Sequence, residues 1–371
     1  MNNIKFYILT FCFTVGCMLC YGQKITLGSC KTKDGGSYNG EMSMGKPHGK
    51  GKATYKNGDC YEGEYVRGKR QGFGVYTFSD GERYEGQWFQ DQQHGKGVFY
   101  FLNNNRYDGL WFRDFQEGQG TMYYYNGDKY EGYWKQDKRV GQGTYVFNGG
   151  AFYKGKWDND MKNGHGTFCW PDGSSYIGLW KDNKKIGQGT FKYADGSVYT
   201  GQWGNDLQHG KGIYRFANGD VYEGDYANGE RTGTGIFKYA NGDVYTGQFK
   251  SGYKDGQGTL TWNFGDTYTG QWKADMPNGT GKLKTKSGDE YEGQFANGMI
   301  DGQGIARYAD GSKFKGNFKK GKRNGPAIEE DKDGNRFEGH YVDDMRHGPY
   351  VEKDRNGKVT AQGTYNKGRK D

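Results

Sequence analysis

The sequence predicts an all-β protein, an elongated single-layer antiparallel sheet of about 15 tandem β-hairpins. Three observations lead to this prediction. Aromatic residues and glycines recur in one pattern every 23 residues, and the residues between them alternate between apolar and polar. The chain also contains 68 Gly but only 5 Pro, with 33% hydrophobic residues. So few aliphatic residues argue against a conventional globular core, whereas an aromatic content of 17% argues against disorder.

The 23-residue period rests on three marks that keep one phase. An aromatic-x-Gly signature begins at Tyr38, Tyr61, Tyr84, Tyr107, Tyr130, Tyr153, Tyr176, Tyr199, Tyr222, Tyr245, Tyr268, Tyr291, Phe314 and Phe337. A Gly-x-Gly pair and a third glycine, usually preceded by Asn or Asp, follow the same step. The positions that represent this structural frame in one stretch are Gly81, Tyr84, Gly86, Trp88, Gly95 and Gly97.

The alternation between these marks has a period of two residues, which is typical of strands and not of helices. It predicts one aromatic face and one polar face. The three-residue connection Lys56-Asn57-Gly58 fits a type I turn followed by a residue with positive φ, for which glycine is suited. For the longer connection, residues 66–73, we expect a loop that places Tyr65 opposite Gly74 and Gly63 opposite Tyr76.

The array is predicted to begin with a half-unit near Gly28 and to end with a degraded unit near Tyr350. With about 30 strands spaced by roughly 4.8 Å, the sheet would extend about 140 Å. The predicted organisation is an export signal at 1–22, an N-terminal half-repeat at 23–37, the main array at 38–321 and degenerate C-terminal repeats at 322–371. Terminal repeats are expected to be atypical because they cap the array.

These repeats, with motifs such as the YEGQW that begins at Tyr84, resemble the MORN (membrane occupation and recognition nexus) repeat. The resemblance covers roughly residues 28–365, and the C-terminal units resemble the variant MORN repeats of bacterial proteins. It implies an elongated antiparallel sheet and a role in membrane apposition, lipid contact or protein scaffolding. It does not imply an enzymatic activity.

The first 22 residues form a segment of their own. Lys5 is the only charge, residues 6–21 are almost wholly apolar, and Cys20 and Gly22 precede a predicted cleavage site before Gln23. We expect a cleaved export signal and a periplasmic, secreted or envelope-associated protein. An uncleaved signal anchor and lipoprotein processing at Cys17 are the alternatives. All three place the repeats outside the cytoplasm.

The cysteines beyond this segment are not expected to form a disulfide with one another. Cys30 falls on the first predicted strand and Cys60 on the fourth, so about 14 Å separates them, and Cys169 is farther along the array. Free thiols or one intermolecular bond remain possible.

No residue pattern indicates catalysis, a cofactor or a bound metal. His48, His94, His209 and His347 share one slot of the repeat, but the first two are two repeats apart, so they cannot share an ion. The Gly-x-Gly runs lack the helix and the Lys-Ser/Thr of phosphate loops. Glutamates such as Glu85 recur on an exposed face instead of forming one local pair. We therefore expect no enzyme, no cofactor and no small-molecule substrate.

The predicted partner is a protein, and the alternative is an anionic lipid or another envelope surface. Nucleic acid is not expected: the net charge is +8, and basic and acidic residues interleave in nearly every repeat. Basic runs also occur near Arg139 and Lys185. The residues proposed for anionic contact are Lys319, Lys320, Lys322, Arg323, Lys367, Arg369 and Lys370. The competing interpretations are that these charges only solubilise the loops, and that the aromatic residues only pack the sheet.

Overall fold

The computed structural model describes residues 24–370, which contain 31 β-strands and no helix that is long and apolar enough to cross a membrane. The predicted export signal at 1–22 and the candidate lipoprotein residue Cys17 lie outside the described residues. The predicted all-β fold of antiparallel hairpins is confirmed. Two compact units can be distinguished, residues 24–127 with 133–137, and residues 128–132 with 138–370. Strand β10 (Lys129–Lys135) contributes to both units.

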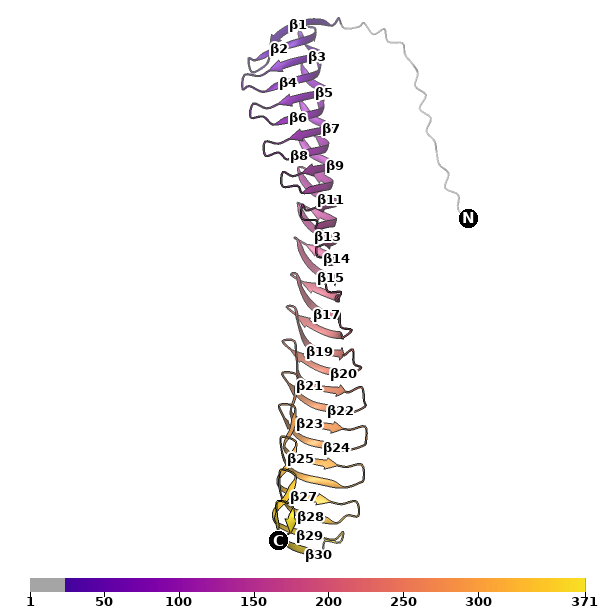
Figure 1. Ribbon diagram of the computed structural model, residues 1–371. Coiled ribbons are helices and arrows are strands. Elements are labelled where there is room, and N and C mark those ends of the chain that lie inside the picture. The colour runs from indigo at the N-terminus through magenta and orange to yellow at the C-terminus, as the bar shows by residue number, and fades with distance from the viewer. Residues whose placement is uncertain (1–23, 371) are drawn as a thin grey trace, which may run out of the picture. The chain divides into compact units, whose positions relative to one another are not determined.

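The first unit is a meander in which each of its strands β1 to β9 pairs antiparallel with the next along the chain (Figure 1). Its strands are β1 (Thr26–Lys31), β2 (Ser37–Ser43), β3 (Lys46–Thr54), β4 (Cys60–Val66), β5 (Lys69–Thr77), β6 (Arg83–Phe89), β7 (Gln92–Tyr100), β8 (Arg106–Phe112) and β9 (Phe115–Tyr123). Seven-residue and nine-residue strands alternate from β2 onward.

The second unit continues the same alternation as far as β29 and the same next-neighbour pairing, for example between β11 and β12, and between β28 and β29. Its strands are β11 (Lys138–Val146), β12 (Phe152–Asp158), β13 (Met161–Cys169), β14 (Ser175–Lys181), β15 (Lys184–Lys192), β16 (Val198–Gly204), β17 (Leu207–Arg215), β18 (Val221–Ala227), β19 (Glu230–Lys238), β20 (Val244–Lys250), β21 (Tyr253–Thr261), β22 (Thr267–Lys273), β23 (Met276–Lys284), β24 (Glu290–Ala296), β25 (Met299–Arg307), β26 (Lys313–Lys319), β27 (Lys322–Glu330), β28 (Arg336–Val342), β29 (Met345–Lys353), β30 (Val359–Asn366) and β31 (Arg369–Lys370).

One of the two kinds of turn is the three-residue loop that the sequence predicts. Between β3 and β4, the amide of Tyr55 donates to the carbonyl of Asp59 (2.9 Å), and the amide of Gly58 donates to the carbonyl of Tyr55 (3.1 Å). Gly58 has φ of 93°. Because such a backbone conformation carries no steric cost for glycine, the Asn-Gly-Asp mark fixes this turn.

The other connection differs from the prediction. Residues 66–73 do not form a long loop: β4 and β5 are joined by the two-residue turn Arg67-Gly68, whose φ values of 52° and 84° are typical of type I′ turns. Gly63 lies opposite Gly74, and Tyr65 lies opposite Arg70. The predicted pairings of Tyr65 with Gly74 and of Gly63 with Tyr76 were therefore wrong, because Tyr76 lies opposite Tyr61. A bulge between the two pairs absorbs the extra residues of the longer strand.

The facing glycines make room for the core of each repeat. The ring of Tyr61 covers Gly74 so closely that a Cβ there would lie 2.2 Å from the tyrosine oxygen. The Tyr61 hydroxyl donates to the carbonyl of Glu64 (3.1 Å), and the Trp88 indole donates to the carbonyl of Gly74 (3.2 Å). Tyr61 meets Trp88 edge to face at 5.3 Å. Such ring pairs add about 0.5–1.5 kcal/mol beyond the burial of their area, so the core is aromatic and local.

Side chains also tie successive turns together. The Asp59 carboxylate accepts hydrogen bonds from the Ser79 amide (2.9 Å) and the Tyr76 hydroxyl (2.6 Å). At the opposite ends of the hairpins, Asp91 accepts from the amide of Arg70 (2.8 Å). The same bridge recurs in the second unit, for example from the Lys254 amide to Asp275 (2.8 Å). Such bonds link neighbouring hairpins along both rows of turns.

Candidate functional site

The residues that represent the repeat frame lie in the packed interior, in a tight turn at Gly81, or, for Gly95, at an irregular position of β7. Tyr84 is fully buried, and its hydroxyl donates to the carbonyl of Gln87 (2.9 Å). Gly86 faces Gly97, and Trp88 packs edge to face on Tyr84 at 5.2 Å. Gly81 and Gly95 have φ of 101° and 64°. Tyr84, Gly86, Trp88 and Gly97 are buried and hold the sheet together, whereas Gly81 is exposed in its turn.

The aromatic face also carries a set of cations that the sequence analysis placed in exposed loops. The guanidinium carbon of Arg139 lies 4.5 Å from the centre of the Trp157 ring, and Lys185 Nζ lies 4.6 Å from the centre of Trp203. Burial lowers the pKa of Lys185 and of Lys162. Cations held over aromatic faces gain electrostatic stabilisation. Arg139 and Lys185 therefore contribute to packing, whereas Lys138 and Lys184 beside them are exposed.

The basic residues proposed for anionic contact lie on two turns of the second unit. Lys319, Lys320 and Lys322 are exposed at the turn between β26 and β27, and Lys367, Arg369 and Lys370 are exposed at the turn between β30 and β31. Arg323 is only half exposed, and its guanidinium carbon lies 4.7 Å from the centre of the Tyr341 ring. Arg323 thus packs against the aromatic face, whereas the lysines beside it are exposed.

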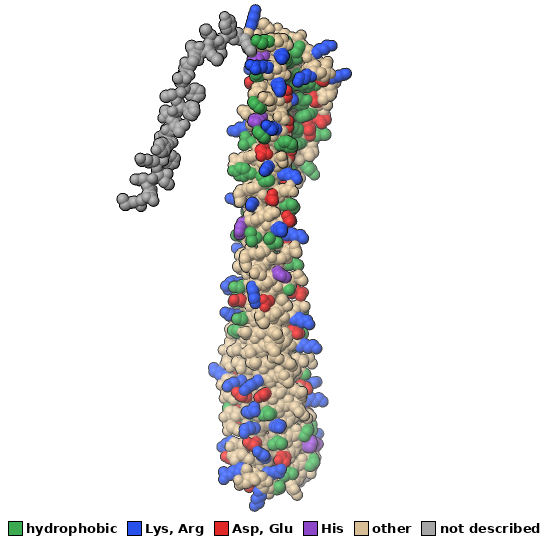
Figure 2. All heavy atoms as spheres, turned by 180° about the vertical axis from the view of Figure 1, so that it is seen from behind, with side chains coloured by type: hydrophobic (Ala, Val, Ile, Leu, Met, Phe, Trp, Pro, Cys, Tyr) green, Lys and Arg blue, Asp and Glu red, His purple; other side chains and the backbone are tan. Residues whose placement is uncertain are grey.

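An acidic turn interrupts this basic set. Asp343 and Asp344 form the turn between β28 and β29, and the Asp344 amide donates to the carbonyl of Arg323 (3.0 Å). Lys322 reaches Asp343 at 4.0 Å, and Arg323 reaches Asp344 at 3.3 Å. Lys370 pairs with Glu352 at 3.3 Å. The two basic turns are therefore not one continuous patch, and ion pairs partly neutralise them. Figure 2 likewise shows basic and acidic side chains interspersed over the visible face.

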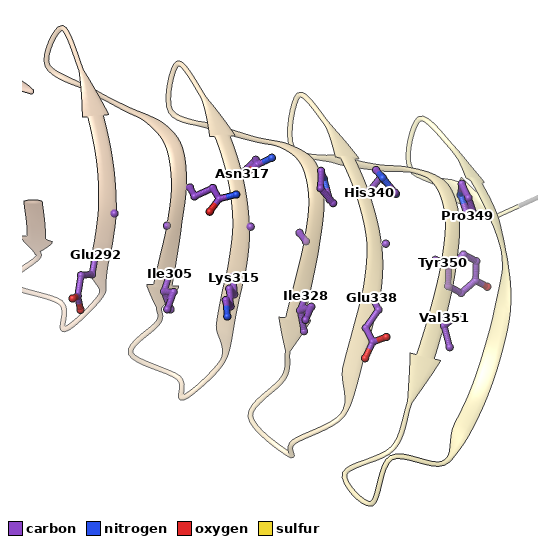
Figure 3. A pocket seen from close by; sticks show the side chains of 17 residues that line it. Glu292, Ile305, Lys315, Asn317, Ile328, Glu338, His340, Pro349, Tyr350 and Val351 are labelled. Atoms are coloured by element: carbon purple, nitrogen blue, oxygen red, sulfur yellow. The ribbon is translucent and has the colours of Figure 1, made fainter. Parts of the chain in front are cut away.

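A furrow of about 790 Å³ in the second unit was not predicted. It crosses β24 to β29 (Figure 3). Because side chains alternate along a strand, Glu292 and Asn317 in its lining lie on the face opposite the buried rings of Tyr291 and Phe318. Its glycine floor is flanked by a row in which apolar and charged side chains alternate: Glu292, Ile305, Lys315, Ile328, Glu338 and Val351. Apolar side chains that alternate with charged ones are suited to a partner that buries a few apolar side chains of its own.

The described residues contain no group of three or more His, Cys, Asp or Glu side chains placed to hold a metal ion. His48, His94 and His209 lie on β3, β7 and β17, and His94 is packed between the rings of Phe89 and Phe112. His340 faces His347 across β28 and β29, a pairing that the histidine spacing did not predict. Cys30, Cys60 and Cys169 lie on β1, β4 and β13, and each is a free thiol.

A family model described as the MORN repeat matches fourteen consecutive segments from residue 38 to residue 357. No curated protein matches the chain. Among solved structures, the TCP domain of SAS-4 (dCPAP) of Drosophila melanogaster, in complex with a proline-rich motif of Ana2, is 17% identical; the match covers 42% of this chain and 85% of that chain, with a TM-score of 0.27. The TCP10 domain of Danio rerio CPAP is 12% identical over 78% of this chain and 99% of that chain, with a TM-score of 0.17. Structural likeness at this level carries no argument about function.

Proposed function

Because this chain belongs to the MORN repeat family, whose repeats typically serve as interaction scaffolds for proteins or lipids, we propose that it is an exported, non-enzymatic scaffold that binds a protein. The observation that carries the proposal is the furrow across β24 to β29. Its apolar side chains Ile305, Ile328 and Val351, of which Ile328 is exposed, lie on successive hairpins and are separated by charged side chains. A partner with apolar side chains at a similar spacing would cover them and pair with the charges. Export is proposed from the character of residues 1–22 alone.

Ile328 is the natural position at which to test this surface, since 43% of its side chain is exposed within the furrow. Crosslinking and affinity capture of the exported protein from its own cells should return a reproducible partner. Ile328→Lys is expected to lower its recovery about tenfold, because the substitution places a charge where an apolar contact would be buried.

The matched control is Val342→Lys, which changes a similarly exposed apolar residue, 39% exposed, outside the furrow. Both variants should keep the wild-type free energy of unfolding within about 0.5 kcal/mol, as surface substitutions usually do. Equal recovery with the two variants would reject the furrow as the binding surface. Failure to capture any reproducible partner, or recovery of the intact chain from the cytoplasm, would count against the exported scaffold itself.

The second candidate is contact with an anionic lipid surface through the exposed turn between β26 and β27. The observation in its favour is that Lys319, Lys320 and Lys322 project together there. Each cation near an anionic surface contributes about 1 kcal/mol, less where an acidic neighbour competes, as Asp343 does for Lys322. The double variant Lys319→Gln/Lys322→Gln is therefore expected to weaken co-sedimentation with phosphatidylglycerol vesicles about tenfold.

The control for this experiment is Lys181→Gln/Lys184→Gln, which alters the same two positions of an earlier repeat. Binding should also fall as salt rises and should be absent with neutral phosphatidylcholine vesicles. Binding that ignores salt and lipid charge would refute the lipid role, as would an equal loss from both double variants.

A further inference from the structure

A second cavity lies on the aromatic face at the start of the first unit. It has a volume of about 670 Å³, within the range of small-molecule sites. Residues 30–34 form one of its walls, and residues 45–47 and 67–70 form the other. Tyr38, Ala53, Tyr55, Tyr65 and Tyr76 also line it. All of these residues belong to the first unit, so the cavity is a property of that unit alone.

The cavity exists because two large side chains of the repeat are replaced by smaller ones. Ala53 occupies the position that Tyr76 holds one repeat later, and Pro47 occupies the position of Arg70. In that later repeat the guanidinium carbon of Arg70 lies 4.9 Å from the centre of the Tyr76 ring and 4.1 Å from the centre of Trp88, so the corresponding space is filled. Arg70 therefore closes the cavity toward the later repeats, which favours a compact ligand over a long chain.

The wall contains a buried hydroxyl that has no hydrogen-bond partner of suitable geometry among residues 24–370. Tyr65 is only 5% exposed and stands where later repeats have Trp88. The Trp88 indole donates to a backbone carbonyl. In the described part of the chain, the Tyr65 hydroxyl has no partner with hydrogen-bond geometry, although the Tyr55 side chain lies close to it. Burial raises the pKa of Tyr65, so this hydroxyl keeps its proton. An unpaired buried hydroxyl is costly, and a ligand oxygen that accepts its proton would remove that cost.

The rim of the cavity carries an excess of unpaired positive charge. Five exposed cations surround it, and none of them forms a salt bridge within residues 24–370: Lys31, Lys33, Lys46, Arg67 and Lys69. The two carboxylates of the lining already accept hydrogen bonds from neighbouring residues. Asp34 accepts hydrogen bonds from Thr32 and from the amide of Lys56, and Asp91 accepts from the amide of Arg70.

We propose that this cavity binds a small amphipathic anion, with an apolar, ring-bearing body against the tyrosines and Ala53 and an acidic group at the lysine-rich rim. This ligand site goes beyond the scaffold role and does not depend on it. The apolar lining accounts for the body of the ligand, the rim cations account for its charge, and the Tyr65 hydroxyl supplies a donor for a ligand oxygen. Carboxylates, sulfonates and phosphates share the chemistry that the rim requires.

The probe for this proposal is 8-anilino-1-naphthalenesulfonate, an aromatic anion whose fluorescence rises in an apolar site. Titration of the purified chain should show one site per molecule. Neither inorganic sulfate, which lacks the rings, nor neutral N-phenyl-1-naphthylamine, which lacks the charge, should displace the probe at a similar concentration. Displacement by the neutral compound at an equal concentration would show that the rim charge plays no part and would overturn the proposal.

Ala53→Tyr should fill the cavity and lower the affinity for the probe at least about tenfold, since Tyr76 fills the same position one repeat later. The control is Ala306→Tyr, which makes the same change at the equivalent position of a later repeat. The exposed pair Lys46→Gln/Lys69→Gln should weaken binding about fivefold without affecting the fold. Lys138→Gln/Lys184→Gln, which changes the same position in two later repeats, should not weaken it. Unchanged affinity in both the cavity variant and the rim variant would overturn the proposal, as would equal losses in the control variants.

Discussion

Gly86→Val is expected to unfold the hairpins that surround it and to lower the free energy of unfolding by more than about 3 kcal/mol. A Cβ at this position would lie 2.4 Å from Gly97 Cα and 2.7 Å from the Tyr84 oxygen. Neither atom can move freely, since Gly97 belongs to the paired strand and the Tyr84 ring is fully buried. Urea denaturation followed by far-ultraviolet circular dichroism measures the loss, and Gly86→Ala should show a smaller loss in the same direction.

Gly149→Ala is the control for this prediction, because a Cβ at Gly149 would meet no atom within 4 Å. It should change the free energy of unfolding by no more than about 0.5 kcal/mol. If Gly86→Val kept the wild-type circular dichroism and stability but lost a binding partner, the facing glycines would belong to a binding surface and not to the packing.

Raising the pH is expected to lower the free energy of unfolding, and this is the second large effect. Burial raises the pKa of Tyr38, Tyr268 and Tyr291 to about 12, against about 10 for a tyrosine in the unfolded chain. The stability that these protonated tyrosines contribute is therefore fully present below pH ~10 and is lost as the pH rises through about 12. Within that window, each tyrosine lowers the free energy of unfolding by up to about 1.4 kcal/mol per pH unit. Because several repeats share the arrangement, these losses add.

Thermal unfolding between pH 8 and pH 11.5, with absorbance at 295 nm to follow tyrosine ionisation, measures this effect. Tyr268→Phe should reduce the loss of stability at alkaline pH. It should also lower the free energy of unfolding by about 1 kcal/mol near neutral pH, because it removes the hydrogen bond that Tyr268 donates to the carbonyl of Gln271. The chain itself carries Phe314 and Phe337 at this position of later repeats, so the ring alone is tolerated. Constant stability from pH 9 to pH 11.5 would contradict the prediction.

Much of this fold follows from local chemistry that is repeated many times. The Asn-Gly-Asp mark dictates the turn at Gly58, and the alternation around Tyr84 dictates which face is buried. The bulged partner strand was mispredicted because its two-residue turn has variable residues, such as Arg67-Gly68 and Asp343-Asp344. Copies with Asn228-Gly229 carry the familiar signal of a type I′ hairpin. Comparison of all copies at this position would have predicted the turn.

The candidate sites were harder to predict, since they depend on departures from the repeat and on how strands align. The basic residues at 319–323 are evident in the sequence, but the pairing of Arg323 with Asp344 requires the spatial order of the turns. The furrow joins side chains such as Ile305 and Ile328 that are one repeat apart. The cavity beside Tyr65 arises where Pro47 and Ala53 interrupt columns of larger residues. In a single sequence, a residue that differs in size from those at the same position of the other repeats is therefore the feature that can indicate such a site.

The side-chain bridges between neighbouring turns also bear on how such a chain can change in length. Asp243 bonds to the amide of Asn263 (2.8 Å), and no bridge of this kind needs a residue beyond the adjoining copy. An insertion or deletion of one whole 23-residue unit would join equivalent ends and restore every bond. Any other length change would leave turns and glycines out of phase. Duplication and loss of complete repeats is thus the route by which such proteins can be lengthened or shortened while their existing surfaces are retained.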